Sequence, residues 1–236
     1  MTVRRTGIAR EVQHGRREDR QCLRSPWTTA RADTVSRADD HPPIPRADLP
    51  DDTKALARYL IGKLVVRALP EGTVSGRIVE TEAYVAGDAA GHGYRRMTPR
   101  NRSLFLERGH AYVYLAYGVS FMLNVSSEAP GIGTGVLIRA LEPLHGIAIM
   151  RLNRGVERLR DIARGPGRLA KALRIDLSLD GTDLCREGPL WLASDGHDPG
   201  AIGQSTRIGI SKDAERPLRF YARESPFVSG PAALNR

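Results

Sequence analysis

The stretch Arg77-Ile78-Val79-Glu80-Thr81-Glu82-Ala83-Tyr84 alternates in side-chain character as a β-strand does. One face of this strand carries Ile78, Glu80, Glu82 and Tyr84, and the other carries Val79, Thr81 and Ala83. A half-buried strand ordinarily has apolar side chains on one face and scattered charge on the other. Two carboxylates and a phenol on one face therefore allow two hypotheses: these side chains face water, or they belong to a functional pocket.

A second stretch, Ala111 to Asn124, favours the pocket. It has the pattern of a β-hairpin, with three tyrosines (Tyr112, Tyr114 and Tyr117) before a turn at Gly118. Tyrosine is common in strands, so ordinary packing accounts for some of these rings, whereas base stacking is the other use of such a cluster. Together the two stretches predict an acidic group inside an aromatic pocket.

The composition favours a polyanionic partner. The chain has 236 residues, a formal charge of +9 and an isoelectric point near 10.0. Such a basic excess is typical of proteins that bind nucleic acid, although it also serves solubility. Cys22 and Cys185 lie far apart, which excludes a cysteine zinc site, and no H-E-x-x-H is present. We therefore expect no metal and no cofactor.

No apolar run is long enough to span a membrane, and no secretory signal follows the first methionine. We therefore expect a protein that is not secreted, and that is cytoplasmic or nucleoid-associated in a bacterium or otherwise nuclear. Residues 1–46 contain ten arginines, no lysine, six acidic residues and few aliphatic ones. This composition predicts a disordered basic extension, followed by one folded domain over residues 47–236.

The remaining pattern mixes helices and strands without strict alternation. We expect helices over 50–61, from Pro143 to just before Gly155, and over 168–174. We expect strands over 63–69, 74–84, 136–141, 190–192, 206–210 and 218–223, with a frayed C-terminus. This order predicts an α+β fold in one domain, a mainly antiparallel sheet with surrounding helices and a protruding β-hairpin.

Two further segments carry candidate functional residues. The loop 85–102 is rich in glycine and arginine and contains His92 and Arg100. Gly165-Pro-Gly-Arg168 predicts a helix N-terminus that can hold a phosphate, although a plain turn into a helix explains it as well. Glu80 and Glu82 leave the same face of one strand, so they do not flank a scissile bond, and one glutamate acting as base on a water is simpler.

Several long motifs follow one another in the chain: Gly76 to Tyr84, Thr98 to Arg102, Ala111 to Gly118, Met122 to Ser127, Val136 to Pro143, Gly165 to Leu169 and Pro217 to Tyr221. In this order they resemble the alkyladenine DNA glycosylases, also called 3-methyladenine DNA glycosylases. The resemblance extends over residues 56–230. It implies a single mixed domain that excises alkylated or deaminated purines from double-stranded DNA by hydrolysing the N-glycosidic bond.

The resemblance also implies roles for individual residues. Glu82 corresponds to the glutamate that activates water, and Arg139 to an arginine near the flipped nucleotide. The base pocket corresponds to Tyr84, His92 and Tyr114, and Asn124 to an asparagine that helps exclude guanine. Tyr117, followed by Gly118, corresponds to the wedge that fills the gap in the duplex, and we expect Arg100 and Arg168 to bind DNA beside it.

These residues predict how the damaged base is bound and how its bond to the sugar is cleaved. Tyr84 and Tyr114 would sandwich the purine and attract a cationic alkylated base by ~0.5–2 kcal/mol. Lys54, Lys63, Lys171 and Lys212 lie outside the motifs, which predicts a monofunctional enzyme without a Schiff-base amine. We expect it to act as a monomer, with no protein partner.

Two alternatives remain open. One is a nucleic-acid-binding module without catalysis, against which Glu82 argues because a carboxylate near phosphates weakens binding. The other is a hydrolase of small N-glycosides, against which the basic charge and the wedge tyrosine argue.

Overall fold

The computed structural model describes residues 41–235, in which an antiparallel sheet is built around one long strand, β2 (Gly72–Tyr84). β2 pairs along one side with β5 (Gly135–His145). Its other side pairs first with β1 (Leu64–Leu69) and then with β8 (Arg219–Ala222). Every residue of β2 from 74 to 83 is buried, so Glu80 and Glu82 do not face water.

The full sheet has the order β3 (Ala111–Ala116), β4 (Ser120–Ser126), β5, β2, β1 and β6 (Leu190–Ala193), while β7 (Ile202–Ser205) pairs with β8. All strand pairs are antiparallel. The α-helices are α1 (Thr53–Tyr59), α2 (Ile147–Arg154) and α3 (Pro166–Ala172). Short 3-10 helices lie at Arg46–Asp48, Arg102–Phe105, Leu159–Asp161, Leu177–Leu179 and Ala232–Leu234. The predicted α+β class with a mainly antiparallel sheet is confirmed.

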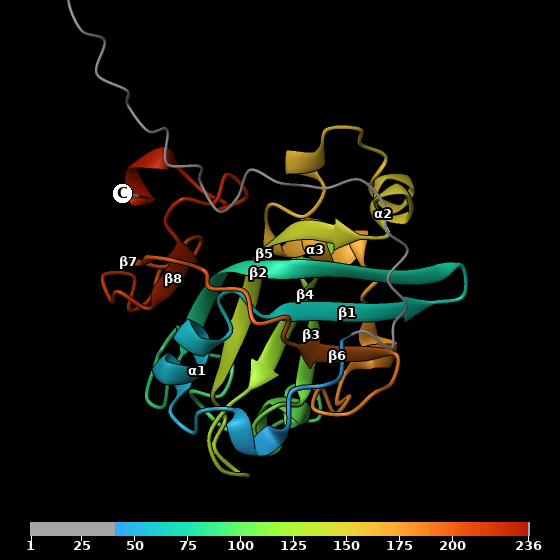
Figure 1. Cartoon of the computed structure of the whole chain (residues 1–236). Helices are drawn as coiled ribbons and strands as arrows, with labels where there is room; N and C mark the ends of the chain where they lie inside the picture. The colour runs from blue at the N-terminus through green and yellow to red at the C-terminus, as the bar shows by residue number, and fades with distance from the viewer. Residues whose placement is uncertain (1–40, 236) are drawn as a thin grey trace, which may run out of the picture.

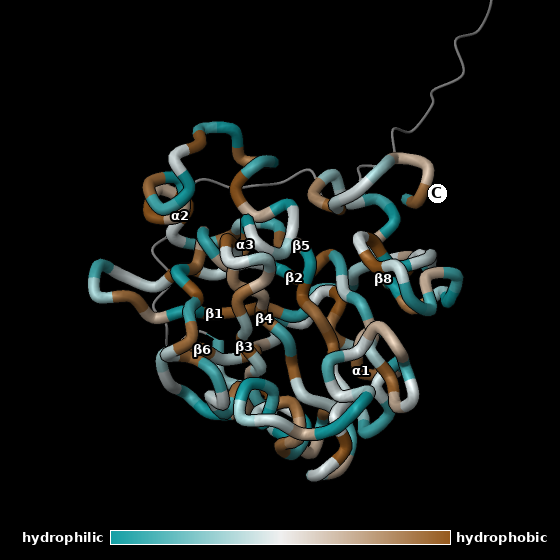
Figure 2. Tube along the Cα trace, turned by 180° about the vertical axis from the view of Figure 1, so that it is seen from behind, coloured by the Kyte–Doolittle hydropathy of each residue, from teal (hydrophilic) through white to brown (hydrophobic). Residues whose placement is uncertain are grey.

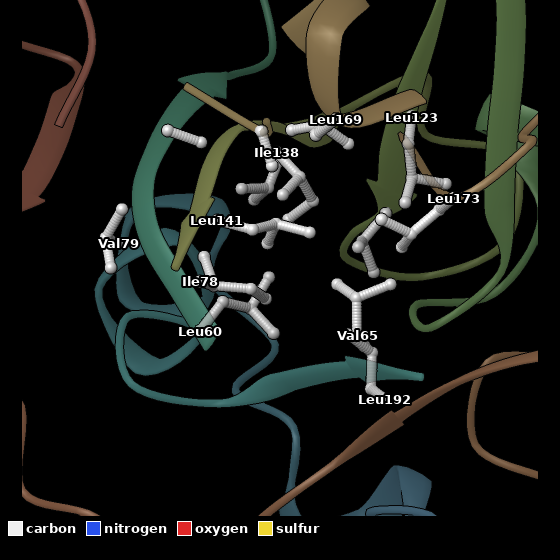
Figure 3. Packing of buried hydrophobic residues seen from close by; sticks show 14 of the residues in the cluster. Leu60, Val65, Ile78, Val79, Leu123, Ile138, Leu141, Leu169, Leu173 and Leu192 are labelled. Carbon is white, nitrogen blue, oxygen red and sulfur yellow. The ribbon is translucent and has the colours of Figure 1, made fainter. Parts of the chain in front are cut away.

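The helices pack on different sides of the sheet (Figure 1). Leu169 and Leu173, in and just after α3, face Leu123 and Ile138 across the main core, as Figure 3 shows. Val79 belongs to the same cluster of buried residues but lies on the other side of β2 (Figure 3). α1 covers that other side, where Thr81 Oγ1 donates a hydrogen bond of 2.9 Å to the carbonyl of Ala57. β2 is therefore enclosed by protein on both faces.

Hydrophobic segments gather along the central strands, whereas many outer loops are hydrophilic (Figure 2). No helix within residues 41–235 has the length and apolar character needed to cross a membrane.

The predicted helix starting at Pro143 is wrong at its beginning. Pro143 lies inside β5 opposite Gly76, beside an irregularity in the pairing with β2, where a residue without an N–H is tolerated. The helix α2 begins only at Ile147, after Gly146 has taken a left-handed conformation (φ 66°).

Two predictions near the C-terminus are also wrong. Residues 206–210 form a loop, not a strand, because the backbone amide of Ile208 binds the Glu82 side chain instead of a neighbouring strand. The C-terminal segment is not frayed: Phe227 and Val228 are buried, and Arg219 donates to the carbonyl of Leu234. The chain thus returns to β2 after β8.

The folded body begins before Ala47, the boundary expected from composition. Ile44 is buried and its amide donates to the carbonyl of Leu192 in β6, at 2.9 Å. The indole N–H of Trp191 donates to the carbonyl of His41, also at 2.9 Å. Residues 41–46 therefore line the outer edge of β6, while the predicted disordered extension otherwise lies outside the described residues.

Candidate active site

The pairing between β2 and β5 is irregular where the two glutamates lie. Ile78 pairs with Leu141 and Glu80 with Ala140, so Val79 has no partner across the strand. Thr81, the next residue of β2, pairs with Ile138, so Arg139 of β5 also has no pairing partner in β2. Such bulges redirect side chains locally. Here the guanidinium of Arg139 reaches both carboxylates of β2.

Glu80 is fully buried and bound by charged and backbone donors. Arg139 Nε lies 2.9 Å and Arg219 Nε 2.7 Å from Oε1, and the amide of Ser229 donates to Oε2 at 2.6 Å. Burial by itself raises the pKa of Glu80, but the two guanidiniums and the Ser229 amide hold this pKa below its usual value. Glu80 is therefore an ionised group that holds β2, β5 and β8 together.

Glu82 is equally buried but less well compensated. Its Oε1 accepts from the amide of Ile208 at 2.7 Å and lies 3.1 Å from Arg139 Nη1, and its Oε2 accepts from the Tyr84 hydroxyl at 3.0 Å. Burial raises the pKa of Glu82 above its usual value despite Arg139 and these hydrogen bonds. A carboxylate accepts about four hydrogen bonds, so one acceptor position of Glu82 remains on Oε2.

A pocket of about 490 Å³ adjoins Glu82 through residues that contact this carboxylate. Glu82 itself has no exposed surface, and its contacts Tyr84, Arg139 and Ile208 form part of the pocket lining. The volume falls within the range of small-ligand sites, which are concave and mostly apolar with a few polar groups. The carboxylate is thus positioned just beneath the pocket lining.

The pocket also contains the aromatic residues that the sequence singled out. His92 and Tyr114 line it, with ring centroids 4.4 Å apart in an edge-on arrangement. His92 Nδ1 lies 2.7 Å from the hydroxyl of Tyr112, which is otherwise buried. Burial, together with Arg100, lowers the pKa of His92, so the imidazole is neutral near pH 7. Tyr112 therefore fixes the orientation of His92 from behind.

Asn124 lines the same pocket from β4. Its Nδ2 donates to the carbonyl of Tyr112 at 3.1 Å, which fixes the orientation of the amide. The structure therefore brings Tyr84, His92, Tyr114, Asn124 and Arg139 together around one cavity next to Glu82.

Tyr117 lies at the tip of the β3–β4 hairpin, with 91% of its surface exposed. Tyr117 and Gly118 both have positive φ, 51° and 72°, the signs required by a type I′ turn. A left-handed conformation is unusual for tyrosine, and the turn projects its ring into solvent beside the pocket, which the residue also lines.

The two predicted DNA-binding arginines lie next to different strands of this hairpin. Arg100 Nη2 donates to the carbonyl of Leu115 in β3, at 3.1 Å. Arg168 lies in the first turn of α3 and lines a groove of about 900 Å³ between α3 and β4, which Val119 also lines. Arg154, Lys171 and Arg174 line the same groove. The two hollows thus flank the exposed tip.

The sequence did not reveal the wall formed by the loop 206–213. Arg207 is buried and forms an ion pair with Asp88, in which Arg207 Nη2 lies 3.0 Å from Asp88 Oδ1 and Arg207 Nη1 contacts Asp88 Oδ2. Arg207 Nη1 also donates to the carbonyl of Ala83. The Arg207 guanidinium lies 4.7 Å from the centroid of the Tyr84 ring. The loop then brings Lys212 to the pocket lining. Lys212 thus lies outside the sequence motifs, as expected from the sequence, and yet lines the pocket. No sequence motif marks this loop, since its position depends on contacts with β2.

Among residues 41–235, no group of three or more His, Cys, Asp or Glu side chains is arranged to hold a metal ion.

Comparison with known proteins identifies the family. Residues 47–226 match the family model described as methylpurine-DNA glycosylase. A putative 3-methyladenine DNA glycosylase of Mesorhizobium japonicum is 83% identical over 204 residues, which cover 86% of this chain and 98% of that protein. One from Paraburkholderia phytofirmans is 50% identical, with 81% and 90% covered. The DNA-3-methyladenine glycosylase of Mus musculus is 44% identical, with 74% and 57% covered. The chain therefore belongs to the methylpurine-DNA glycosylase family and is a DNA glycosylase.

Proposed function

We propose that this chain flips damaged purines out of duplex DNA and hydrolyses their N-glycosidic bond, leaving an abasic site for base excision repair. The observation that carries the proposal is the placement of Glu82, with one unused acceptor position, next to a pocket lined by tyrosine rings. A base stacked in a duplex cannot reach such a pocket, so it must first leave the helix, at a cost of a few kcal/mol.

Glu82 acts as the general base that deprotonates the attacking water and offsets positive charge on the sugar. A general base works best when its pKa approaches the working pH, and burial shifts the pKa of Glu82 in that direction. Arg139 bonds both glutamates and holds Glu82 in place.

The rings of Tyr84 and Tyr114 hold the flipped base. The Tyr112 hydroxyl occupies Nδ1 of the neutral His92, which leaves Nε2 to hydrogen-bond the polar edge of a purine. Asn124 uses one N–H on the Tyr112 carbonyl, and its remaining polar atoms select against guanine.

Tyr117 fills the space that the flipped nucleotide leaves in the duplex. Its exposure at the hairpin tip supports this role, since no protein contact has to break when it enters DNA. Arg100 and Arg168, next to different strands of the hairpin, bind phosphates of the DNA strands, with Arg154 and Lys171 extending the basic groove.

The substrates include alkylated and deaminated purines, and the enzyme acts as a monomer on genomic DNA in the cytoplasm or nucleoid of a bacterium. The basic N-terminal extension is not needed for the chemistry.

The test uses duplex oligonucleotides with a single 7-methylguanine, hypoxanthine or 1,N6-ethenoadenine. Incubation with the protein should produce alkali-labile abasic sites at the lesion. A binding module without catalysis would retain the duplex and produce none. A hydrolase of small N-glycosides would instead release bases from free nucleosides and leave the duplex intact.

A further inference from the structure

The buried charges beneath the pocket balance one another. Glu80 and Glu82 bond Arg139, Glu80 also bonds Arg219, and Asp88 pairs with the guanidinium of Arg207. When all six groups are ionised, these three carboxylates and three guanidiniums carry no net charge. A bound base therefore experiences chiefly the charges that remain unpaired at the pocket wall.

The unpaired charge at the wall is positive. Lys212 lines the pocket and has no hydrogen bond or ion pair among the described residues. No Asp or Glu is found among the pocket-lining residues of the described chain. Arg100, which lies close enough to depress the pKa of His92, has no carboxylate partner within residues 41–235 either. The chain segments around Lys212 are anchored, since Arg207 Nη2 donates to the carbonyl of Asp213, at 3.2 Å.

The ring that would stack on the base has a cation beside it already. Arg207 lies 4.7 Å from the Tyr84 ring centroid. An aromatic face attracts a cation through its negative quadrupole, and a cation already bound to the ring weakens the attraction for a second one. Tyr84 therefore offers a cationic purine less stabilisation than an unoccupied tyrosine would.

We propose that Lys212 biases this pocket toward uncharged purine lesions, such as hypoxanthine, and against cationic N-alkylated purines. The inference rests on the proposed function and adds to it a preference between uncharged and cationic lesions. The stacking and hydrogen-bonding contacts serve both kinds of lesion, whereas the ammonium of Lys212 repels only the charged kind. The preference is thus electrostatic and decreases as salt increases.

The test compares single-turnover excision of 7-methylguanine and hypoxanthine, each opposite cytosine in the same duplex, by the wild type, Lys212→Gln and Lys54→Gln. Lys54 is exposed on α1, so its exchange removes the same charge away from the pocket. Lys212→Gln should raise the ratio of the 7-methylguanine rate to the hypoxanthine rate by about two- to fivefold, as expected for one exposed charge. Lys54→Gln should leave this ratio unchanged.

An unchanged ratio in Lys212→Gln overturns the inference. An equal loss for both lesions with a shallower salt dependence also overturns it, since Lys212 would then bind a phosphate. If the wild type forms no abasic site on either duplex, the proposed function itself fails, and the inference fails with it.

Discussion

Replacing Glu80 or Glu82 by glutamine removes one charge from the same strand, yet the two exchanges should affect different properties. Glu80 binds Arg139, Arg219 and the amide of Ser229, all inside the protein. Removing one member of a buried ion pair leaves an uncompensated charge and costs ~3–5 kcal/mol. In a protein of this size each kcal/mol lowers the melting temperature by ~2–4 °C, so Glu80→Gln should melt ~6–20 °C lower.

Glu82→Gln should retain the fold and lose the reaction. The amide oxygen can still accept from Ile208 and Arg139, and the amide N–H can donate to the hydroxyl of Tyr84. Because burial already disfavours the ionised form of Glu82, stability at neutral pH should change by less than ~1 kcal/mol or increase. Loss of the general base should lower the single-turnover excision rate by ~10²–10⁴-fold.

The pH dependence of melting provides an independent check. The pKa of Glu80 is lowered in the fold, so its stabilisation is present above its ordinary pKa of 4.5 and is lost as the pH falls. The deficit of Glu80→Gln should therefore shrink in acid. The pKa of Glu82 is raised in the fold, so its contribution to the stability of the fold is lost as the pH rises above 4.5. The melting temperature of Glu82→Gln should therefore increase relative to that of the wild type as the pH rises.

The assay pairs thermal melting between pH 4 and 8 with single-turnover excision of hypoxanthine. Glu82→Gln with a rate within a few-fold of the wild type would refute its role as base. A melting temperature of Glu80→Gln equal to that of the wild type would refute the structural role of Glu80.

Three further predictions concern the wedge, the pocket lysine and the N-terminal segment. Tyr117→Ala should have the melting temperature of the wild type but excise a paired lesion ~10–100-fold more slowly, since base stacking is worth ~1–3 kcal/mol. This loss of rate should be smaller at a mismatched lesion, which flips out more easily. An equal loss of rate at paired and mismatched lesions would contradict the wedge role. Borohydride should trap no protein on DNA, and an adduct that disappears in Lys212→Gln would reveal a Schiff base. A chain beginning at His41 should melt like the full chain. A chain beginning at Ala47 lacks the buried Ile44, so its free energy of unfolding should be lower by ~1.5–3 kcal/mol or more. Equal melting temperatures of the chains beginning at His41 and at Ala47 would show that residues 41–46 add no stability.

The sequence predicted the parts of the site that depend on local pattern. The alternation around Glu80 and Glu82 placed both on one face, and the glycine after Tyr117 predicted the turn that exposes its ring. The family resemblance selected the residues that line the pocket. These features depend on neighbours in the chain or on motifs that recur within the family.

The rest depends on contacts between distant segments. The alternating residues 206–210 have the composition of a strand, but Glu82, 126 positions away, takes the amide of Ile208 and makes them a loop. That loop in turn brings Lys212 to the pocket. The bulges at Val79 and Arg139 likewise arise from strand pairing, which no single-strand pattern contains.

The Ser229 amide bound to Glu80 has a consequence for synthesis of the enzyme. Residues 228–235 leave the ribosome well after β2, and until they arrive Glu80 lacks one of its donors and Arg219 lacks the carbonyls that it binds there. In a nascent chain that ends before this segment, Glu80 is therefore incompletely hydrogen-bonded, although Arg139 and Arg219 still neutralise its charge. The central strand β2 should therefore reach its full stability only after residues 228–235 have folded against it.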